Sequence, residues 1–146
     1  MTCILRASGK HFDVDDFISK SSLITSSLWR KGEKRFPNSR TNETTNQASG
    51  IRIVASEADF SELSRQIEDV IAFLRQHLDA IKMLTAFHGV EGAVLDFGAE
   101  LHPPGWASFT FPTELLALAG ATGVSLCVSV YPSDPEDDTD VQAVGT

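Results

Sequence analysis

Two carboxylates in one short stretch are the first candidates for chemistry in this sequence. Asp96 and Glu100 are four residues apart in GAVLDFGAEL, where apolar and polar residues alternate as in a β-strand. On one strand face at about 3.3 Å per residue, their Cα atoms would lie roughly 13 Å apart. The carboxyl groups of glycosidases are only about 5 to 9.5 Å apart. The pair therefore does not predict acid–base catalysis.

Patterns for metal binding and nucleophilic catalysis are missing as well. The sequence has four histidines, His11, His77, His88 and His102. None of them has the His-x-x-x-His or Glu-x-x-His spacing of a metal site. Cys127 has no base close to it in sequence, and there is no Gly-x-Ser-x-Gly motif or glycine-rich phosphate loop. We predict no catalytic residue, no metal site and no cofactor.

The stretch SLWRKGEKRF (27–36) places four basic residues around Trp29 in a chain whose net charge is −8. Basic groups beside a stacking aromatic ring are typical of proteins that bind single-stranded nucleic acids. Such proteins usually array several aromatic rings along a basic groove, whereas here only Phe36 accompanies Trp29. We favour a structural interpretation, in which Trp29 packs at a strand end and Gly32 supplies a turn. The basic side chains then balance the acidic half of the chain, within one molecule or across a dimer.

Charge and hydropathy exclude two classes of partner. Residues 1–56 carry nine Lys and Arg against five Asp and Glu, while residues 57–146 carry three against fifteen. This excess of acid argues against binding a polyanion over the whole surface. No run approaches the roughly 18 apolar residues of a membrane helix, so we expect no membrane contact. The segment MTCILRASGK lacks the features of a secretory signal, and we expect a cytoplasmic protein with free thiols.

Hydrophobic periodicity predicts the elements that would position these residues. Helices are predicted from an N-cap at Asp13 to about Ser21, from an N-cap at Asp59 to His88-Gly89, and over 113–119. Strands are predicted at 2–8, 27–33, 50–56, 92–101, 106–112 and 124–131. The polar segment 36–50 is expected to be a mobile loop, and 132–146 a disordered acidic tail after a single domain of residues 1–131.

The order β-α-β-β-α-β-β-α-β predicts an α+β fold. Each predicted helix lies between two strands and has one apolar face. We expect a two-layer sandwich, with three helices on one face of a mainly antiparallel sheet of about six strands. From the third strand onward, the order β-α-β-β-α-β is that of the ferredoxin-like motif.

The sheet face opposite the helices is the candidate binding surface. Strand parity places Cys3 toward the core and Cys127 away from it, so the two should not form a disulfide. The candidate binding residues on the outer face are Arg6, Arg52, Asp96, Glu100, Ser125, Cys127, Ser129 and Tyr131, and the same parity adds Ser8, Ser56, Ser108 and Thr110. A polar face of this kind is either a solvated surface or a site for a partner, a second subunit, or a small anion held by Arg6 and Arg52.

Three segments in order resemble one known family. They are HFDVDDFISKSSLITSSLWRKGE (11–33), the long central amphipathic helix, and FPTELLALAGATGVSLCVSVYP (111–132). This order is similar to that of the bacterial family catalogued as domain of unknown function 4279, and the resemblance covers residues 3–131. It implies that Asp13, Trp29, Lys31 and Gly32 are signature residues. Members often have a tryptophan in the strand after the loop, where GIRIVAS has isoleucines. The family implies no activity.

Together these observations favour a non-enzymatic bacterial protein-binding module, of which inhibitors and immunity-type proteins are examples. Its partner would be another protein or a second copy of the chain. The alternative is a small-ligand binder or enzyme that uses Arg6, Arg52, Asp96 and Glu100 on the open sheet face. A second alternative is weak nucleic-acid binding through residues 29–35.

Overall fold

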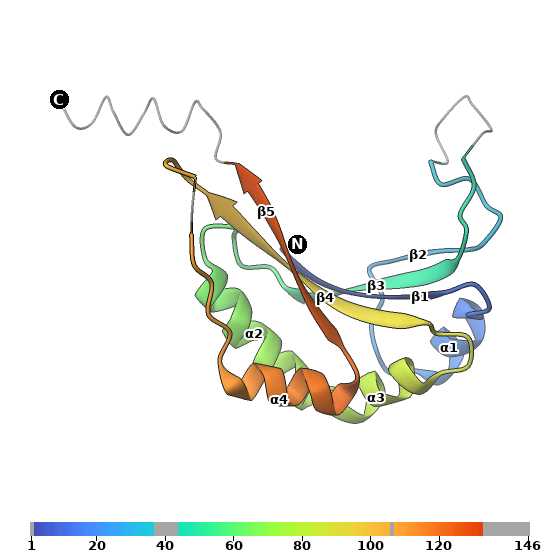
Figure 1. The fold of residues 1–146 in the computed structure, drawn as a ribbon. Helices are drawn as coiled ribbons and strands as arrows, with labels where there is room; N and C mark the ends of the chain where they lie inside the picture. Colours follow the sequence, from blue (N-terminus) through green and yellow to red (C-terminus); the bar gives the residue numbers. More distant parts are fainter. Residues whose placement is uncertain (1, 37–43, 106, 133–146) are drawn as a thin grey trace.

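The structure is a computed structural model that describes residues 2–36, 44–105 and 107–132. Its strands are β1 (Cys3–Gly9), β2 (Ser27–Trp29), β3 (Ser49–Ser56), β4 (Gly92–Leu101) and β5 (Ser125–Pro132). Its helices are α1 (Val14–Lys20), α2 (Leu63–Gln76), α3 (Leu78–Ala86) and α4 (Thr113–Thr122). All the helices lie on one face of the sheet (Figure 1), which confirms the predicted α+β class with helices on a single face.

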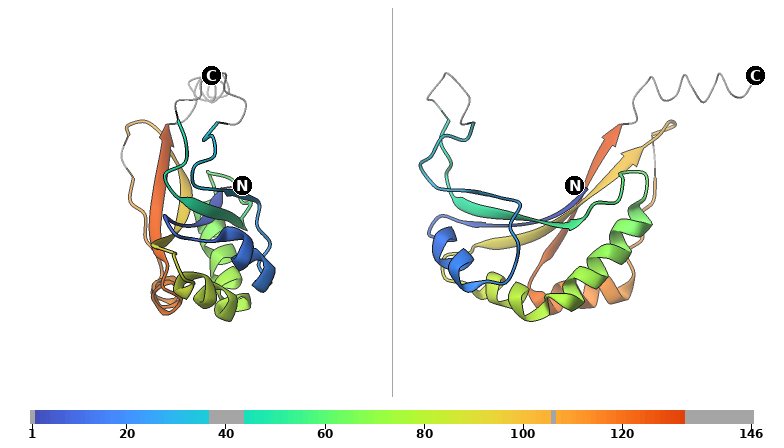
Figure 2. Two further views of the ribbon diagram at one scale, coloured as in Figure 1. Left: turned by 90° about the vertical axis from the view of Figure 1, so that its right-hand side faces the viewer. Right: turned by 180° about the vertical axis from the view of Figure 1, so that it is seen from behind.

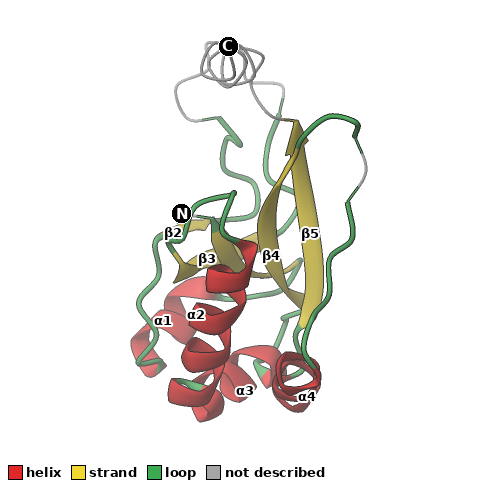
Figure 3. Cartoon of the chain, turned by 90° about the vertical axis from the view of Figure 1, so that its left-hand side faces the viewer, coloured by secondary structure: helices red, strands yellow, loops and turns green. Residues whose placement is uncertain are grey.

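The strands form one mixed sheet in the order β2-β3-β1-β4-β5. β1 is central and pairs antiparallel with β3 and β4, β2 pairs antiparallel with β3, and β4 pairs parallel with β5. Seen from the side, the sheet and the helices form two separate layers (Figure 3). We call the face of the sheet that carries no helix the open face. The sheet curves so that both of its ends rise away from the helices (Figure 1).

The described part of the chain has five strands where six were predicted, because residues 107–112 form no strand. The place beside β4 is taken by β5, which runs parallel to it. A parallel neighbour requires a crossover connection, usually helical. The crossover between β4 and β5 contains α4, and before α4 Phe111 packs on Phe97 of β4 at 5.3 Å between ring centroids. The β-α-β-β-α-β order that suggested a ferredoxin-like motif is therefore absent among the described residues.

The predicted long helix is two helices, α2 and α3, with a break at His77. The apolar periodicity continues through the break, because Leu74, Ile81 and Leu84 are all fully buried. The two helices follow one another along the underside of the curved sheet (Figure 2), and neither proline nor glycine marks the change of direction. The helix also begins at Leu63 and not after Asp59, whose carboxylate accepts a hydrogen bond from the Phe60 amide.

The prediction for the first helix is confirmed. Asp13 is the N-cap of α1, and its carboxylate accepts a hydrogen bond from the Asp16 amide at 3.1 Å. Phe12 and Phe17 form the expected staple, with their ring centroids 5.9 Å apart. The rings of both residues also meet Phe87, so this cluster holds α1 against the end of α3.

The second strand is shorter than predicted and ends at Trp29. The chain turns there, because the Glu33 amide bonds to the Arg30 carbonyl and Gly32 has a φ of +86°, which favours glycine. The Arg30 side chain reaches α1 and donates two hydrogen bonds to Asp15, at 3.0 and 2.8 Å. This corrects the expectation that Arg30 balances the acidic half of the chain, since Asp15 belongs to the more basic half.

The Arg30–Asp15 pair predicts a pH dependence of stability. The hydrogen bond and charge of Arg30 hold the pKa of the Asp15 carboxyl below its ordinary value of 3.8. A carboxyl whose pKa is lower in the folded state stabilises the fold above the unfolded pKa, and the contribution is lost as pH falls through the folded pKa. We expect Asp15→Asn to lower the free energy of unfolding at pH 7, with a difference from wild type that shrinks below pH 3.8.

Urea denaturation across this pH range is the measurement. Arg30→Gln should show the same pH dependence, and the double variant should be little worse than either single variant, because both remove one interaction. A difference between wild type and Asp15→Asn that persists at the lowest pH would contradict the assignment.

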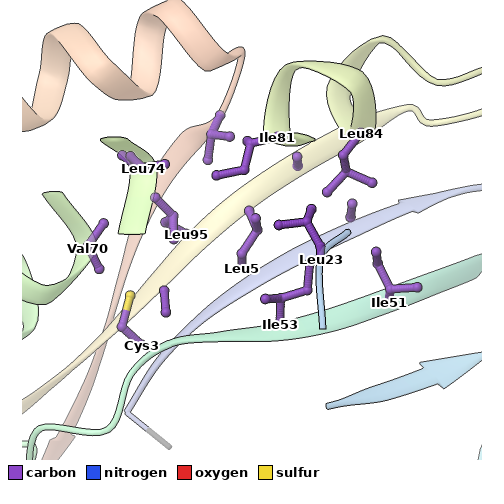
Figure 4. Close-up of a cluster of buried hydrophobic side chains, with 14 of the residues drawn as sticks. Cys3, Leu5, Leu23, Ile51, Ile53, Val70, Leu74, Ile81, Leu84 and Leu95 are labelled. Carbon is purple, nitrogen blue, oxygen red and sulfur yellow. The ribbon is translucent and has the colours of Figure 1, made fainter. Parts of the chain in front are cut away.

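The core lies between the sheet and the helices. Alternate residues of β1, β3 and β4 point into it, and they meet one face of α2 and α3 (Figure 4). The predicted inward phase of these strands is confirmed, since Leu5, Ile51, Ile53 and Leu95 are all at most 2% exposed. Because these residues point into the core, the residues that alternate with them along each strand point to the open face.

Two predicted segments fall partly outside the described residues. Residues 37–43 of the predicted loop and 133–146 of the predicted tail are not described. The loop prediction was wrong at its end, because Ser49 and Gly50 are buried residues of β3 and Thr45 forms a bridge with Lys34. Within the described ranges, every helix is too short or too polar to cross a membrane.

Candidate functional site

Two arginines stand directly opposite one another at the centre of the open face. Arg6 of β1 and Arg52 of β3 are register partners, so their side chains leave the sheet on the same side. Asp96 of β4 lies beside them and bonds to Arg6, with 3.2 Å between Nη2 and Oδ2. Ser129 of β5 donates a hydrogen bond to the other Asp96 oxygen at 2.7 Å. A chain of polar contacts thus crosses from β1 to β5.

The charges at this centre do not balance. Asp96 neutralises Arg6, while the ion pairs of the described residues include none to Arg52. Like charges directly opposite each other on neighbouring strands destabilise a sheet. Arg6 also keeps its Nε atom buried, with no hydrogen-bond partner in the described part of the chain. The centre of the open face is therefore locally positive in a chain of net charge −8.

Trp29 forms one side of this centre. Its register partner is Gly50, which places the indole on the open face. A Cβ added at Gly50 would lie 2.2 Å from the indole ring, so the ring rests on the glycine. The guanidinium of Arg52 covers the ring from 4.8 Å, a cation–π geometry. The predicted packing of Trp29 at a strand end is confirmed in part, because the ring packs on the backbone of the open face and not on the core.

A second pair of aromatic rings closes the opposite side. Phe60, from the turn before α2, lies over Gly98, where an added Cβ would come within 2.3 Å of the ring. Tyr131 of β5 contacts Phe60, with 5.1 Å between ring centroids. Phe60 was predicted to be an apolar residue of the long helix. Its place on the open face explains why α2 begins after it.

Two adjoining hollows meet at the arginines. The larger, of about 360 Å³, is lined by both arginines and by Ser8, Trp29, Val94 and Ser125. The smaller, of about 140 Å³, is lined by the same two arginines and by Phe60, Asp96, Ser129 and Tyr131. Guanidinium groups bind carboxylate and phosphate oxygens in a fixed, often two-pronged geometry. The arginines can hold an anionic group between Trp29 on one side and Phe60 and Tyr131 on the other.

Most of the predicted site residues come together here. Arg6, Arg52, Asp96 and Ser129 line the smaller hollow with Tyr131, and Ser125 lines the larger one. Cys127 is the register partner of Asp96 and so shares its face, although it lines neither hollow. Glu100 does not join them, because it lies 3.5 Å from His102 and lines a separate hollow beside the start of α2.

Three other residues predicted on this face are elsewhere. Ser56 was expected to point outward, but an irregularity in the β1–β3 register shifts its parity. It is buried and donates a hydrogen bond to Asp69 of α2 at 2.7 Å. Ser108 and Thr110 lie in the crossover and line the hollow near Glu100.

The remaining signature residues have structural roles. Asp13 caps α1, Gly32 makes the turn after β2, and the Lys31 amide donates a hydrogen bond to the Ser49 hydroxyl at 2.9 Å. The Lys31 side chain is exposed. These residues stabilise the start of α1, the turn after β2 and the contact of that turn with β3.

The two cysteines and the possible metal ligands of the described residues were also compared with the sequence predictions. Cys3 and Cys127 are both free, as parity predicted. Burial raises the pKa of the Cys3 thiol strongly, with a smaller contribution from the Asp96 charge, so this thiol stays protonated. Among residues 2–36, 44–105 and 107–132 there is no group of three or more His, Cys, Asp or Glu side chains that could hold a metal ion.

Sequence reasoning missed three residues of the site. Gly50 and Gly98 each make room for an aromatic ring, and Phe60 supplies one of the rings. Glycine inside a strand pattern is a known sign of close approach by another group. That sign was present in GIRIVAS and GAVLDFGAEL, but it does not reveal which ring approaches.

Comparison with known proteins agrees with the resemblance inferred from sequence. Residues 1–133 match the model of the family described as Domain of unknown function (DUF4279). No curated protein and no solved structure matches the chain. The matched segment contains every strand and helix described above, including the open face with its arginine pair. The chain therefore belongs to the DUF4279 family.

Proposed function

We propose that the protein is a non-enzymatic binding module whose partner is another protein, held on the open face. An acidic side chain or chain end of the partner is bound between Arg6 and Arg52. The observation that carries this proposal is the pair of arginines opposite each other on β1 and β3, with Asp96 as the one carboxylate that pairs with them among the described residues. The module acts in the cytoplasm of a bacterium, where its thiols remain reduced.

The electrostatics support an anionic group in the partner. Without a ligand, the fold tolerates two facing guanidinium groups, an arrangement that opposes stability. Hydrogen bonds from guanidinium to carboxylate are charge-assisted and are about twice as strong as neutral ones. A second carboxylate, bound at Arg52, would give each of the two guanidinium groups its own carboxylate partner. An anionic partner would therefore gain much of its binding energy at Arg52, whose guanidinium has no carboxylate partner among the described residues.

The aromatic rings support a protein partner. Trp29, Phe60 and Tyr131 flank the arginines, and Trp, Tyr and Arg are the residues that most often dominate binding energy at protein interfaces. The Trp29 ring is held between Gly50 and Arg52, so it need not become ordered on binding. This packing does not favour nucleic-acid binding, since stacking on a base requires a free ring face.

A small anionic ligand is the second candidate function. The larger hollow, of about 360 Å³, falls within the range of roughly 300 to 1,000 Å³ that is common for small-molecule sites. The two candidates make different predictions for purified protein. In native mass spectrometry of the purified protein, a tightly held small anion should appear as a fixed increase of the size of a small molecule. A protein partner should give no increase of that size.

The test is capture of a partner from lysate by the tagged protein and by matched arginine variants. We expect Arg52→Gln to weaken binding by about 30-fold, as is typical when a hot-spot residue worth roughly 2 kcal/mol is removed. Arg65→Gln is the control, because Arg65 is an exposed arginine of α2 on the helix side. A photo-crosslinking residue at Ser8, in the larger hollow, should attach to the same partner.

Two outcomes would contradict the proposal. One is equal recovery of the partner with Arg52→Gln and Arg65→Gln. The other is cross-linking from Glu68, an exposed residue on the helix side, but not from Ser8. Circular dichroism of each variant separates loss of binding from loss of folding.

A further inference from the structure

A second surface of the molecule, at the edge of the sheet formed by β5, is independent of the arginine pair. β5 ends the strand order, and its outer edge has no strand partner among the described residues. β5 and α4 lie at the same side of the molecule, in the sheet and helix layers respectively (Figures 2 and 3). Residues 102–105 and 107–112 make no backbone hydrogen bond to β5. Within the described residues, the amide and carbonyl groups along the outer edge of β5 therefore have no backbone partner.

Apart from Pro132 at its C-terminal end, β5 lacks the charged residues and prolines that normally prevent association of edge strands. Natural edge strands are protected by charges, proline or bulges. Residues 115–131 contain no Asp, Glu, Lys or Arg, although 32 of the 146 residues of the chain are charged. Leu116 of α4 and Val130 and Tyr131 of β5 are 49%, 44% and 48% exposed. An uncharged edge strand with exposed apolar side chains is a template for pairing with another strand.

Gly120 gives a separate indication that another chain approaches α4. It lies within the helix, where glycine costs about 1 kcal/mol relative to alanine. An added Cβ would have nothing within 4 Å, and its φ is not positive, so packing and turn geometry within the chain give no reason for glycine. The exposed neighbours Ala117 and Ala121 are also small. Small residues let two helices approach closely when they meet.

We infer that this edge binds a second copy of the same chain, with β5 of one copy antiparallel to β5 of the other about a two-fold axis. A strand that pairs antiparallel with itself is self-complementary, as a two-fold interface requires. Each copy has a net charge of −8, so two copies repel one another over most of their surfaces. The uncharged edge is where that repulsion is smallest.

This geometry has a consequence for the open face. An antiparallel pair at the edge joins the two sheets into one and keeps the same face of each sheet on the same side. The two arginine pairs would then face the same direction, and the two α4 helices would meet beneath the joined strands. The dimer would present two copies of the binding site to one partner or to two.

The test is sedimentation equilibrium of the full chain at several concentrations. The wild type is expected to have twice the 15.8 kDa mass of one chain. Leu116→Glu and Val130→Lys each place a like charge on both copies at the interface, and each should raise the dimer dissociation constant by at least about 10-fold. Ile24→Lys is the control and should leave the dimer intact, since Ile24 is 87% exposed and lies between α1 and β2.

A second measurement locates the contact. In a Cys127→Ser background, Ala121→Cys should form an intermolecular disulfide on mild oxidation, whereas Ile24→Cys should not. Unchanged circular dichroism would show that the charged variants fold. A wild type that remains monomeric up to about 0.2 mM would overturn the inference, and so would a dimer that survives both charged substitutions. Neither result tests the proposed binding of a partner at Arg52, because Arg52 lies on the open face toward the opposite edge of the sheet.

Discussion

Replacing Phe17 with alanine is expected to lower the free energy of unfolding by about 3 to 5 kcal/mol, the usual cost of removing a buried phenylalanine ring. Phe17 is fully buried, and its ring meets Phe12 and Phe87 edge to face, with centroid distances of 5.9 and 5.3 Å. These rings attach α1 to the rest of the core. A helix of seven residues is not stable by itself, so loss of the ring should release it.

Urea denaturation followed by circular dichroism measures this change. Ile24→Ala is the matched control, because Ile24 is a large apolar residue of the same region that is 87% exposed. Its substitution should change the free energy of unfolding by less than about 0.5 kcal/mol. A loss below about 1 kcal/mol for Phe17→Ala would mean that α1 does not dock through this cluster.

The second large effect is expected at Gly50, where Gly50→Val should displace the Trp29 ring. The added Cβ would lie 2.2 Å from the indole and 2.7 Å from the Ala7 carbonyl oxygen. Neither distance is possible for real atoms, and the carbonyl belongs to the central strand. Overpacking of this kind costs typically 1 to 3 kcal/mol. Displacing the indole also removes the ring beneath Arg52, so partner binding should fall by at least about 10-fold.

Tryptophan fluorescence tests whether the ring is displaced. Fluorescence of the Trp29 indole, measured in a Trp106→Phe background, should shift toward that of a solvated indole. Gly92→Ala serves as the control. Gly92 lines the larger hollow beside Trp29, and a Cβ added there has nothing within 4 Å. An unchanged fluorescence spectrum in Gly50→Val would contradict the placement of the ring on this glycine.

Local sequence patterns predicted the features that depend on residues close together in the sequence. Alternation identified β1, β3 and β4 together with their inward faces, because one buried face fixes the parity of a strand. It also located β5, although Val130, which was predicted to point inward, is 44% exposed. The cap at Asp13 was readable because its hydrogen bond spans three residues. The break at His77 was not readable, since the helices bend to follow a curved sheet while the apolar spacing continues.

Strand pairing was the part that local patterns could not supply. The segment 107–112 alternates like a strand, but the edge of β4 that it would occupy is taken by β5. Parity was enough to place Arg6, Arg52 and Asp96 on one face. It could not show that Arg6 and Arg52 are direct partners, because register depends on the whole sheet. It also failed at Ser56, where a register shift moves the side chain to the helix side.

The central position of β1 determines when the proposed site can form. The Arg6–Asp96 contact joins residues 90 positions apart in the sequence, and Arg52 reaches Arg6 only when β3 has paired with β1. Contacts between distant residues require closure of long loops, which slows folding. A partly folded chain with its helices formed would still lack the arginine pair. Partner binding would thus require β1 to have paired with both β3 and β4, and its recovery during refolding would report that pairing.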